Sequence, residues 1–207
     1  MSTVQVDTIN ESTSGSGVTI DGVLIKDGNV DGVDVSGITS AGLVPIHTET
    51  FSGVTAVSVD DKLDASLYSG YKIIGENFRW SSDGRQLRWR FRKATNSDVT
   101  GTYTRQMAYE YNSSQSQGYS TTTDYGYLSS SHGQQSGEGL SFQADVVVQT
   151  NGFSYLTAML LFKREDNLSI SYRFVSGVNT TDTINGFQFF PDANNFSGKI
   201  YLYGYKI

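Results

Sequence analysis

The sequence has no cysteine among its 207 residues and contains only two histidines. Disulfides and thiolate-bound zinc are therefore excluded, and His47 and His132 are the only imidazoles available for metal binding or base chemistry. Positive charge is also scarce, because 15 Lys and Arg stand against 21 Asp and Glu, a formal net charge of -6. Nucleic-acid binding needs clustered positive side chains, so we expect no nucleic-acid partner.

Long apolar runs are missing as well. No stretch approaches the ~20 apolar residues that a membrane-spanning helix requires. The first residues, 1–17, are polar, whereas a secretory signal has a basic start followed by an apolar segment. The sequence therefore predicts neither a membrane protein nor a protein exported by such a signal.

Aromatic residues and glycine are abundant instead, with Tyr 13, Phe 11 and Gly 22. This composition favours strands and tight turns over helices. The length suffices for one core of about 150 residues and an appendage. We expect an all-β protein with an N-terminal attachment and trimerisation arm at residues 1–45 and an antiparallel β-sandwich, jelly-roll-like, at residues 46–207.

The arm contains short apolar segments separated by Asp-Gly pairs between residues 18 and 38. An Asp-Gly pair beside β-branched residues is typical of tight turns between very short strands. Such strands bury little and leave their edges exposed, so they need another chain beside them. We predict that three identical chains assemble through this arm, at Val18, Ile20, Val23, Ile25, Val30, Val33 and Val35.

The same acidic residues have a second interpretation. Residues 27–32, Asp-Gly-Asn-Val-Asp-Gly, match the opening of an EF-hand calcium loop. The match then fails, because the twelfth position is Ile38 instead of a bidentate Glu and no amphipathic helix flanks the segment. Turn chemistry is the favoured interpretation, and we expect no metal and no cofactor.

Residues 41–46, which include Pro45, are interpreted as a linker into the sandwich. The clearest strand is 87–92, where Leu87, Trp89 and Phe91 alternate with three arginines. Further strands are expected at 51–59, 71–74, 140–148, 155–162, 168–174, 183–190 and 198–207, with a turn at 81–84. Seven or eight antiparallel strands of this kind make a two-sheet sandwich or jelly roll.

Residues 112–137 differ from the rest, because they are Ser, Thr, Asn, Gln, Gly and Tyr with almost no aliphatic side chain. We interpret them as a long polar excursion that carries one edge strand near 125–128.

Two parts of the sequence, the arm and the sandwich region, resemble structural proteins of tailed bacteriophages. Residues 6–11 (VDTINE) and 17–28 (GVTIDGVLIKDG) look like the N-terminal leader of phage fibre and head-decoration proteins. Residues 51–54 (FSGV), 67–74 (LYSGYKII) and 198–206 (GKIYLYGYK) are similar to trimeric jelly-roll tips. The resemblance implies a homotrimeric capsid decoration, head-fibre or tail-fibre protein, located in the virion, made in the host cytoplasm and bound to other virion proteins. It supplies no catalytic residues.

Nothing in the sequence indicates catalysis, so we expect that the protein is not an enzyme. His47 lies beside Pro45 and His132 lies in the polar excursion, and both are interpreted as loop residues. Residues 163–166 (KRED) are interpreted as a solvated hairpin turn. No glycine-rich phosphate loop is present.

Recognition is the alternative function. Tyr119, Tyr125 and Tyr127 lie among hydrogen-bonding side chains, and such a composition suits sugar stacking. They would make the chain the host-receptor, glycan-binding tip of a tail fibre, or they would pack within the sandwich or trimer. The arginines at 88, 90 and 92 could pair with acidic residues of the same sheet or a neighbouring subunit. A polysaccharide or nucleic-acid groove is the weaker alternative, because the net charge is negative.

Overall fold

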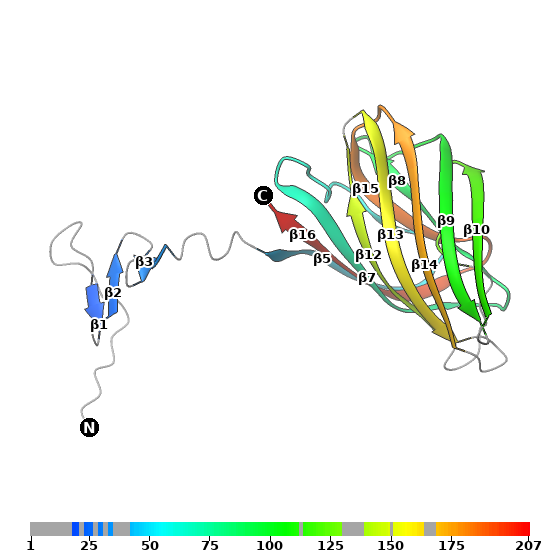
Figure 1. Ribbon diagram of the computed structural model, residues 1–207, viewed down its shortest axis with the longest axis horizontal. Helices are drawn as coiled ribbons and strands as arrows, with labels where there is room; N and C mark the ends of the chain where they lie inside the picture. The colour runs from blue at the N-terminus through cyan, green and yellow to red at the C-terminus, as the bar shows by residue number, and fades with distance from the viewer. Residues whose placement is uncertain are drawn as a thin grey trace, which may run out of the picture. The chain divides into compact units, whose positions relative to one another are not determined.

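The computed structural model describes residues 18–20, 23–26, 29–30, 33–34, 42–111, 114–129, 139–149, 151–163 and 169–207. Every regular element in these ranges is a β-strand, and they contain no helix, which confirms the all-β prediction. The chain divides into two compact units, Met1–Gly42 and Leu43–Lys206 (Figure 1).

The first unit contains an antiparallel sheet of four very short strands in sequential order. These are β1 (Val18–Ile20), β2 (Val23–Lys26), β3 (Asn29–Val30) and β4 (Val33–Asp34). Ile20 pairs with Val23 and Val30 pairs with Val33, so two residues separate the paired strand ends in each case. Those connecting residues, and Val35 of the predicted assembly set, lie outside the described residues.

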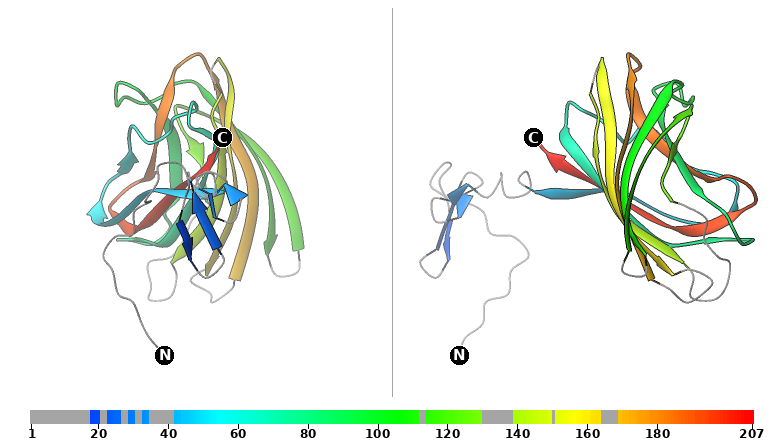
Figure 2. Two further views of the ribbon diagram at one scale, coloured as in Figure 1. Left: turned by 90° about the vertical axis from the view of Figure 1, so that its left-hand side faces the viewer. Right: turned by 45° about the vertical axis from the view of Figure 1, so that its right-hand side comes forward.

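The second unit is a sandwich of two antiparallel sheets, seen from two sides in Figure 2. The large sheet has eight strands in the order β10-β9-β14-β13-β12-β7-β16-β5. Their bounds are β5 (Leu43–Val54), β7 (Tyr68–Trp80), β9 (Thr102–Tyr111), β10 (Ser114–Thr123), β12 (Leu140–Val147), β13 (Gly152–Lys163), β14 (Ser169–Thr180) and β16 (Phe196–Lys206). The small sheet has four strands in the order β11-β8-β15-β6, with β6 (Val57–Val59), β8 (Leu87–Lys93), β11 (Gly126–Tyr127) and β15 (Ile184–Pro191).

Aromatic rings fill the space between the sheets. The Phe189 ring of the small sheet lies 5.4 Å from that of Phe142 and 6.0 Å from that of Phe78, both of the large sheet. Trp89 is fully buried and packs edge-on against Phe91 at 4.9 Å and Tyr103 at 5.6 Å between ring centroids. The predicted buried face of 87–92 is thereby confirmed.

The linker prediction for 41–46 is wrong for its second half, because β5 already begins at Leu43. Pro45 lies inside this strand, opposite Tyr203, next to a register shift between Leu202 and Tyr203. β5 is the last strand of the large sheet. An edge strand tolerates proline because a residue on the open side has no partner to which it must donate.

The polar excursion is also wrong over 114–123, where β10 pairs with β9 along its whole length. β10 is an edge strand whose described side chains are all at least partly exposed, so it lacks the apolar alternation that marks other strands. The predicted edge strand near 125–128 is confirmed by β11, at the end of the small sheet. Residues 130–138 lie outside the described part of the chain.

Replacing Trp89 by Ala should lower the free energy of unfolding by roughly 3–5 kcal/mol, the range for deleting a large buried aromatic side chain. Urea denaturation followed by circular dichroism measures it. Leu161→Ala is the control, because Leu161 is 57% exposed and surface truncations of this kind change stability by about 0.5 kcal/mol or less. Equal unfolding midpoints for Trp89→Ala and the wild type would contradict this assignment of the core.

Candidate functional site

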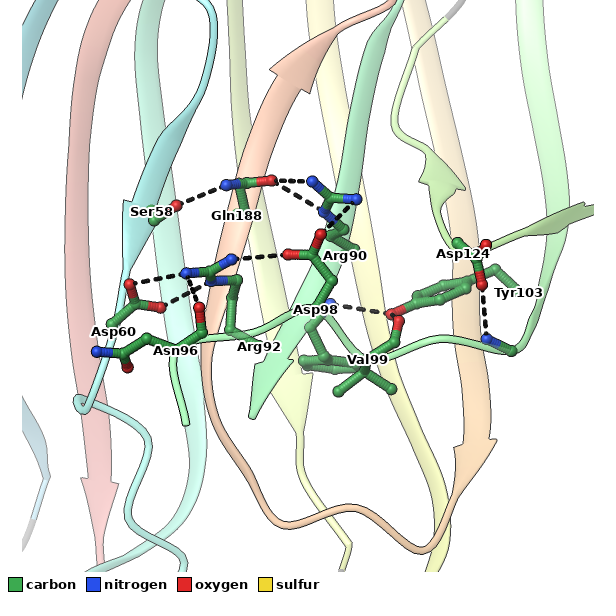
Figure 3. Close-up of polar contacts among 12 residues, drawn as sticks. Ser58, Asp60, Arg90, Arg92, Asn96, Asp98, Val99, Tyr103, Asp124 and Gln188 are labelled. Atoms are coloured by element: carbon green, nitrogen blue, oxygen red, sulfur yellow. Dashed lines mark hydrogen bonds and ion pairs between the residues drawn. The ribbon is translucent and has the colours of Figure 1, made fainter. Parts of the chain in front are cut away.

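Two of the three arginines of β8, Arg90 and Arg92, are engaged by acidic residues of the same sheet and its loops (Figure 3). The Arg90 guanidinium lies 2.8 Å from the Asp98 carboxylate, and the Arg92 guanidinium lies 2.7 Å from the same carboxylate. Arg92 also donates to Asp60 at 2.9 Å. Asp98 therefore bridges two arginines, and the hydrogen bond to Asp60 raises the pKa of Arg92.

The network extends across the small sheet through an amide. Arg90 donates to the Gln188 carbonyl from Nε and Nη2, at 2.9 and 2.6 Å. The Gln188 amide nitrogen then donates to the Ser58 hydroxyl at 2.7 Å. β8, β15 and β6 are thus linked by side chains as well as by their backbone ladder. Since these guanidinium groups are already engaged within the sheet, the structure favours the structural interpretation of Arg90 and Arg92.

The buried hydroxyl of Tyr103 holds the backbone of β8 against the loop that follows it. The Tyr103 hydroxyl accepts the backbone N–H of Phe91 at 3.0 Å and donates to the carbonyl of Val99 at 3.2 Å. Burial raises the pKa of Tyr103, so this hydroxyl stays protonated and keeps both bonds.

The three tyrosines predicted as a sugar platform do not come together. Tyr125 and Tyr127 contact each other edge-on at 5.4 Å, and the Arg88 guanidinium lies 4.5 Å from the Tyr125 ring centroid. The Arg105 guanidinium lies 5.2 Å from the Tyr127 ring. Tyr119 is 72% exposed and belongs to the large sheet. Two of the rings therefore serve packing and cation–π contacts, and the third is exposed on the other sheet.

The other chemistry-bearing residues of the sequence do not form a reactive site in the described part of the chain. His47 lies on β5, where a loop residue was expected, with Nε2 3.4 Å from Glu49. His132 and residues 164–166 lie outside the described residues. Within the described ranges, no group of three or more His, Asp or Glu could hold a metal ion. The same ranges contain no helix that could span a membrane.

The candidate site lies on the outer face of the large sheet, which we define as the face turned away from the small sheet. On β12, Phe142, Ala144 and Val146 are buried, whereas Gln143 and Asp145 are exposed. Strand register extends this face into rows of neighbouring side chains, because directly paired residues point to the same side. One row is Tyr119, Gln106, Val175, Thr157, Asp145 and Lys72.

The next row holds an arginine at its centre and consists of Gln117, Ala108, Arg173, Met159 and Gln143. The two rows, apart from Tyr119, line a hollow of about 530 Å³. A second hollow of about 350 Å³ also includes Arg173, together with Glu110 and Gln115. We call these two hollows the outer groove. Of the predicted tyrosines, only Tyr119 lies on this face, cross-strand from Gln106.

Apolar side chains are exposed along the same face. Met159 is 45% exposed, Leu161 57% and Val175 41%. Contiguous apolar patches rimmed by polar residues mark interaction sites, whereas single exposed apolar residues are normal. Met159 and Val175 lie on adjacent strands, and both line the larger hollow. The groove thus combines apolar contacts, amide groups and one guanidinium.

Sequence reasoning missed the outer groove because its residues come from six different strands, β7, β9, β10, β12, β13 and β14. Each strand contributes one or two polar side chains at ordinary alternating positions. The order of the strands is what brings them together, and alternation within one strand carries no information about that order.

Replacing Asp98 by Ala should lower the free energy of unfolding by roughly 1.5–3 kcal/mol, because hydrogen bonds to charged groups contribute that much and both arginines lose a partner. Thermal and urea unfolding measure the change. Asp145→Ala is the matched control. Its carboxylate forms a single ion pair and is 53% exposed, and exposed pairs contribute about 0–1 kcal/mol. A loss at Asp98 no larger than that at Asp145 would show that the network does not stabilise the sheet.

The chain matches no known protein-family model, no curated protein sequence and no solved structure.

Proposed function

We propose that this chain is a non-catalytic structural protein of a tailed-bacteriophage particle, a homotrimeric capsid decoration, head-fibre or tail-fibre protein that is anchored through its N-terminal arm. The observation that carries the proposal is the division of the chain into two units of different kind. The described residues of the first form strands of two to four residues, and the second is a sandwich with a core of its own. An attachment segment joined to a displayed domain has this organisation.

The short strands support assembly between chains. β1 and β4 are the edges of the four-stranded sheet, and each offers unpaired backbone groups. Strands of this length bury too little to be stable alone, and exposed edges are satisfied by further pairing. Three copies side by side would supply that pairing at the assembly positions given above.

In this proposal the sandwich is the jelly-roll-like displayed domain. Its eight-plus-four division is unequal, whereas a jelly roll distributes eight strands over its two sheets. The resemblance to jelly-roll tips thus concerns the two-sheet antiparallel packing. Glycan recognition by the three tyrosines is the weaker alternative, because Tyr125 and Tyr127 are engaged with arginines.

Trimer formation is tested by multi-angle light scattering on the full chain at micromolar concentration. We expect a mass of about three chains, because assembly would cover the open edges of the arm sheet. A stable folded monomer would contradict the trimer.

Attachment is tested by deleting residues 1–40. The truncated protein should keep its β-sheet circular dichroism and its unfolding midpoint, because the sandwich core draws on residues from Phe51 onward. It should be lost from purified particles that carry the wild-type protein. Incorporation at wild-type stoichiometry would show that the arm is not the anchor.

A further inference from the structure

The outer groove presents an arginine that has no partner among the residues that the structure describes. Arg173 is exposed at the centre of the face and forms no hydrogen bond or ion pair with any residue that the structure describes. This contrasts with Arg90 and Arg92, whose guanidinium groups are held by Asp98. A guanidinium recognises a carboxylate through two parallel hydrogen bonds. Arg173 therefore has the capacity to bind one anionic group.

The nearby acidic residues, Asp145 and Glu110, do not pair with the Arg173 guanidinium. Asp145 is the only carboxylate among the described residues that line the larger hollow. It is already neutralised by Lys72 Nζ at 3.2 Å and accepts the Tyr205 hydroxyl at 2.9 Å. Glu110 lines the smaller hollow. It is a diagonal neighbour of Arg173, because Arg173 pairs with Ala108 and Glu110 follows Ala108 by two residues on the same strand. The two side chains form no ion pair. Glu110 therefore repels an anionic ligand, but it leaves the Arg173 guanidinium open to bind one.

The other groups of the groove match a sugar. Three exposed glutamines around Arg173, at 106, 117 and 143, can each donate to and accept from hydroxyl groups. Met159 and Val175 present apolar surface between them, against which the C–H face of a sugar ring can pack. A volume of about 530 Å³ lies within the range of small-ligand sites.

A second copy of the chain is a poorer occupant of this face. The centre of a protein–protein interface is depleted of Lys, Asp and Glu, whereas Lys72, Asp145 and Glu110 all lie along this face. Burial against another sheet would desolvate Arg173 and the three amides, and each unpaired group would then cost free energy. A ligand that carries many hydroxyls and a carboxylate can satisfy all of these groups.

We propose that the outer groove binds an acidic saccharide, with Arg173 pairing with its carboxylate and Gln106, Gln117 and Gln143 binding its hydroxyls. This inference goes beyond the proposed structural role and is testable on the isolated protein. It differs from the tyrosine platform in position and in ligand charge, since the groove lies on β7, β9, β10, β12, β13 and β14 and selects an anion.

The test is isothermal titration calorimetry of the full chain with three carboxylated oligosaccharides: trigalacturonic acid, an alginate trisaccharide and 3′-sialyllactose. Each is compared with its methyl ester, which keeps the sugar and removes the charge. We expect at least one acid to bind and its ester to bind about tenfold more weakly or worse, the difference that a charge-assisted pair makes. Failure of all three acids to bind, or equal affinity for acid and ester, overturns the proposal.

Variants locate the site. Arg173→Gln should weaken binding of the acid about tenfold or more, with little effect on the ester. Glu110→Gln should strengthen binding about twofold to fivefold at low salt, because a repulsive charge beside the ligand is removed. Arg79→Gln is the matched control, an exposed arginine on β7 outside the groove, and should leave affinity unchanged. An equal loss from Arg79→Gln and Arg173→Gln would mean non-specific charge attraction and overturn the site.

Sedimentation velocity distinguishes the competing occupant. Arg173→Gln and Leu161→Gln should leave the association state of the full chain as in the wild type, because the groove faces a ligand. A change in association state for both variants would make this face a contact between subunits and overturn the saccharide site.

Discussion

Packing of aromatic rings between the two sheets is the interaction on which the rest of this structure depends. Phe78 and Phe142 of the large sheet meet Phe189 of the small sheet in edge-to-face contacts. The backbone is adapted to them. A side chain at Gly75 would collide with the Phe142 ring, so glycine there leaves space for the aromatic residue on the neighbouring strand. Because this core fixes which side of every strand is inside, it also fixes what the two outer faces carry.

The two outer faces use their polar side chains differently. On the small sheet, Arg90 and Arg92 form ion pairs with Asp98 and Asp60, and these pairs hold strands and loops together. On the large sheet, Arg173 and its neighbouring glutamines have no such partners in the described part of the chain. A stable sheet does not need these groups to be placed together. Their convergence on one hollow is what makes the large sheet the functional candidate.

In the proposed role, the arm and the sandwich meet two separate requirements, attachment and display. The sandwich supplies a core that is built from strands of up to 13 residues. The arm supplies strands of two to four residues with open edges, which suit pairing with other chains. In the proposed role, the arm determines where the protein is held and the outer groove determines what the held domain contacts.

The sequence by itself determined the all-β class and the strands in which one side is apolar. Trp89 and its neighbours could be assigned to the core because alternation along a strand depends only on local geometry. Strand prediction from the sequence failed where a strand has no buried side, as in β10. It also failed where an edge strand tolerates proline, as at Pro45. Neither feature leaves a local pattern, because an edge is defined by the absence of a neighbouring strand. The tertiary structure alone decided that Tyr119 lies apart from Tyr125 and Tyr127, and that Arg173 stands among three glutamines. Those outcomes depend on strand order and register, and contacts between residues distant in sequence set both.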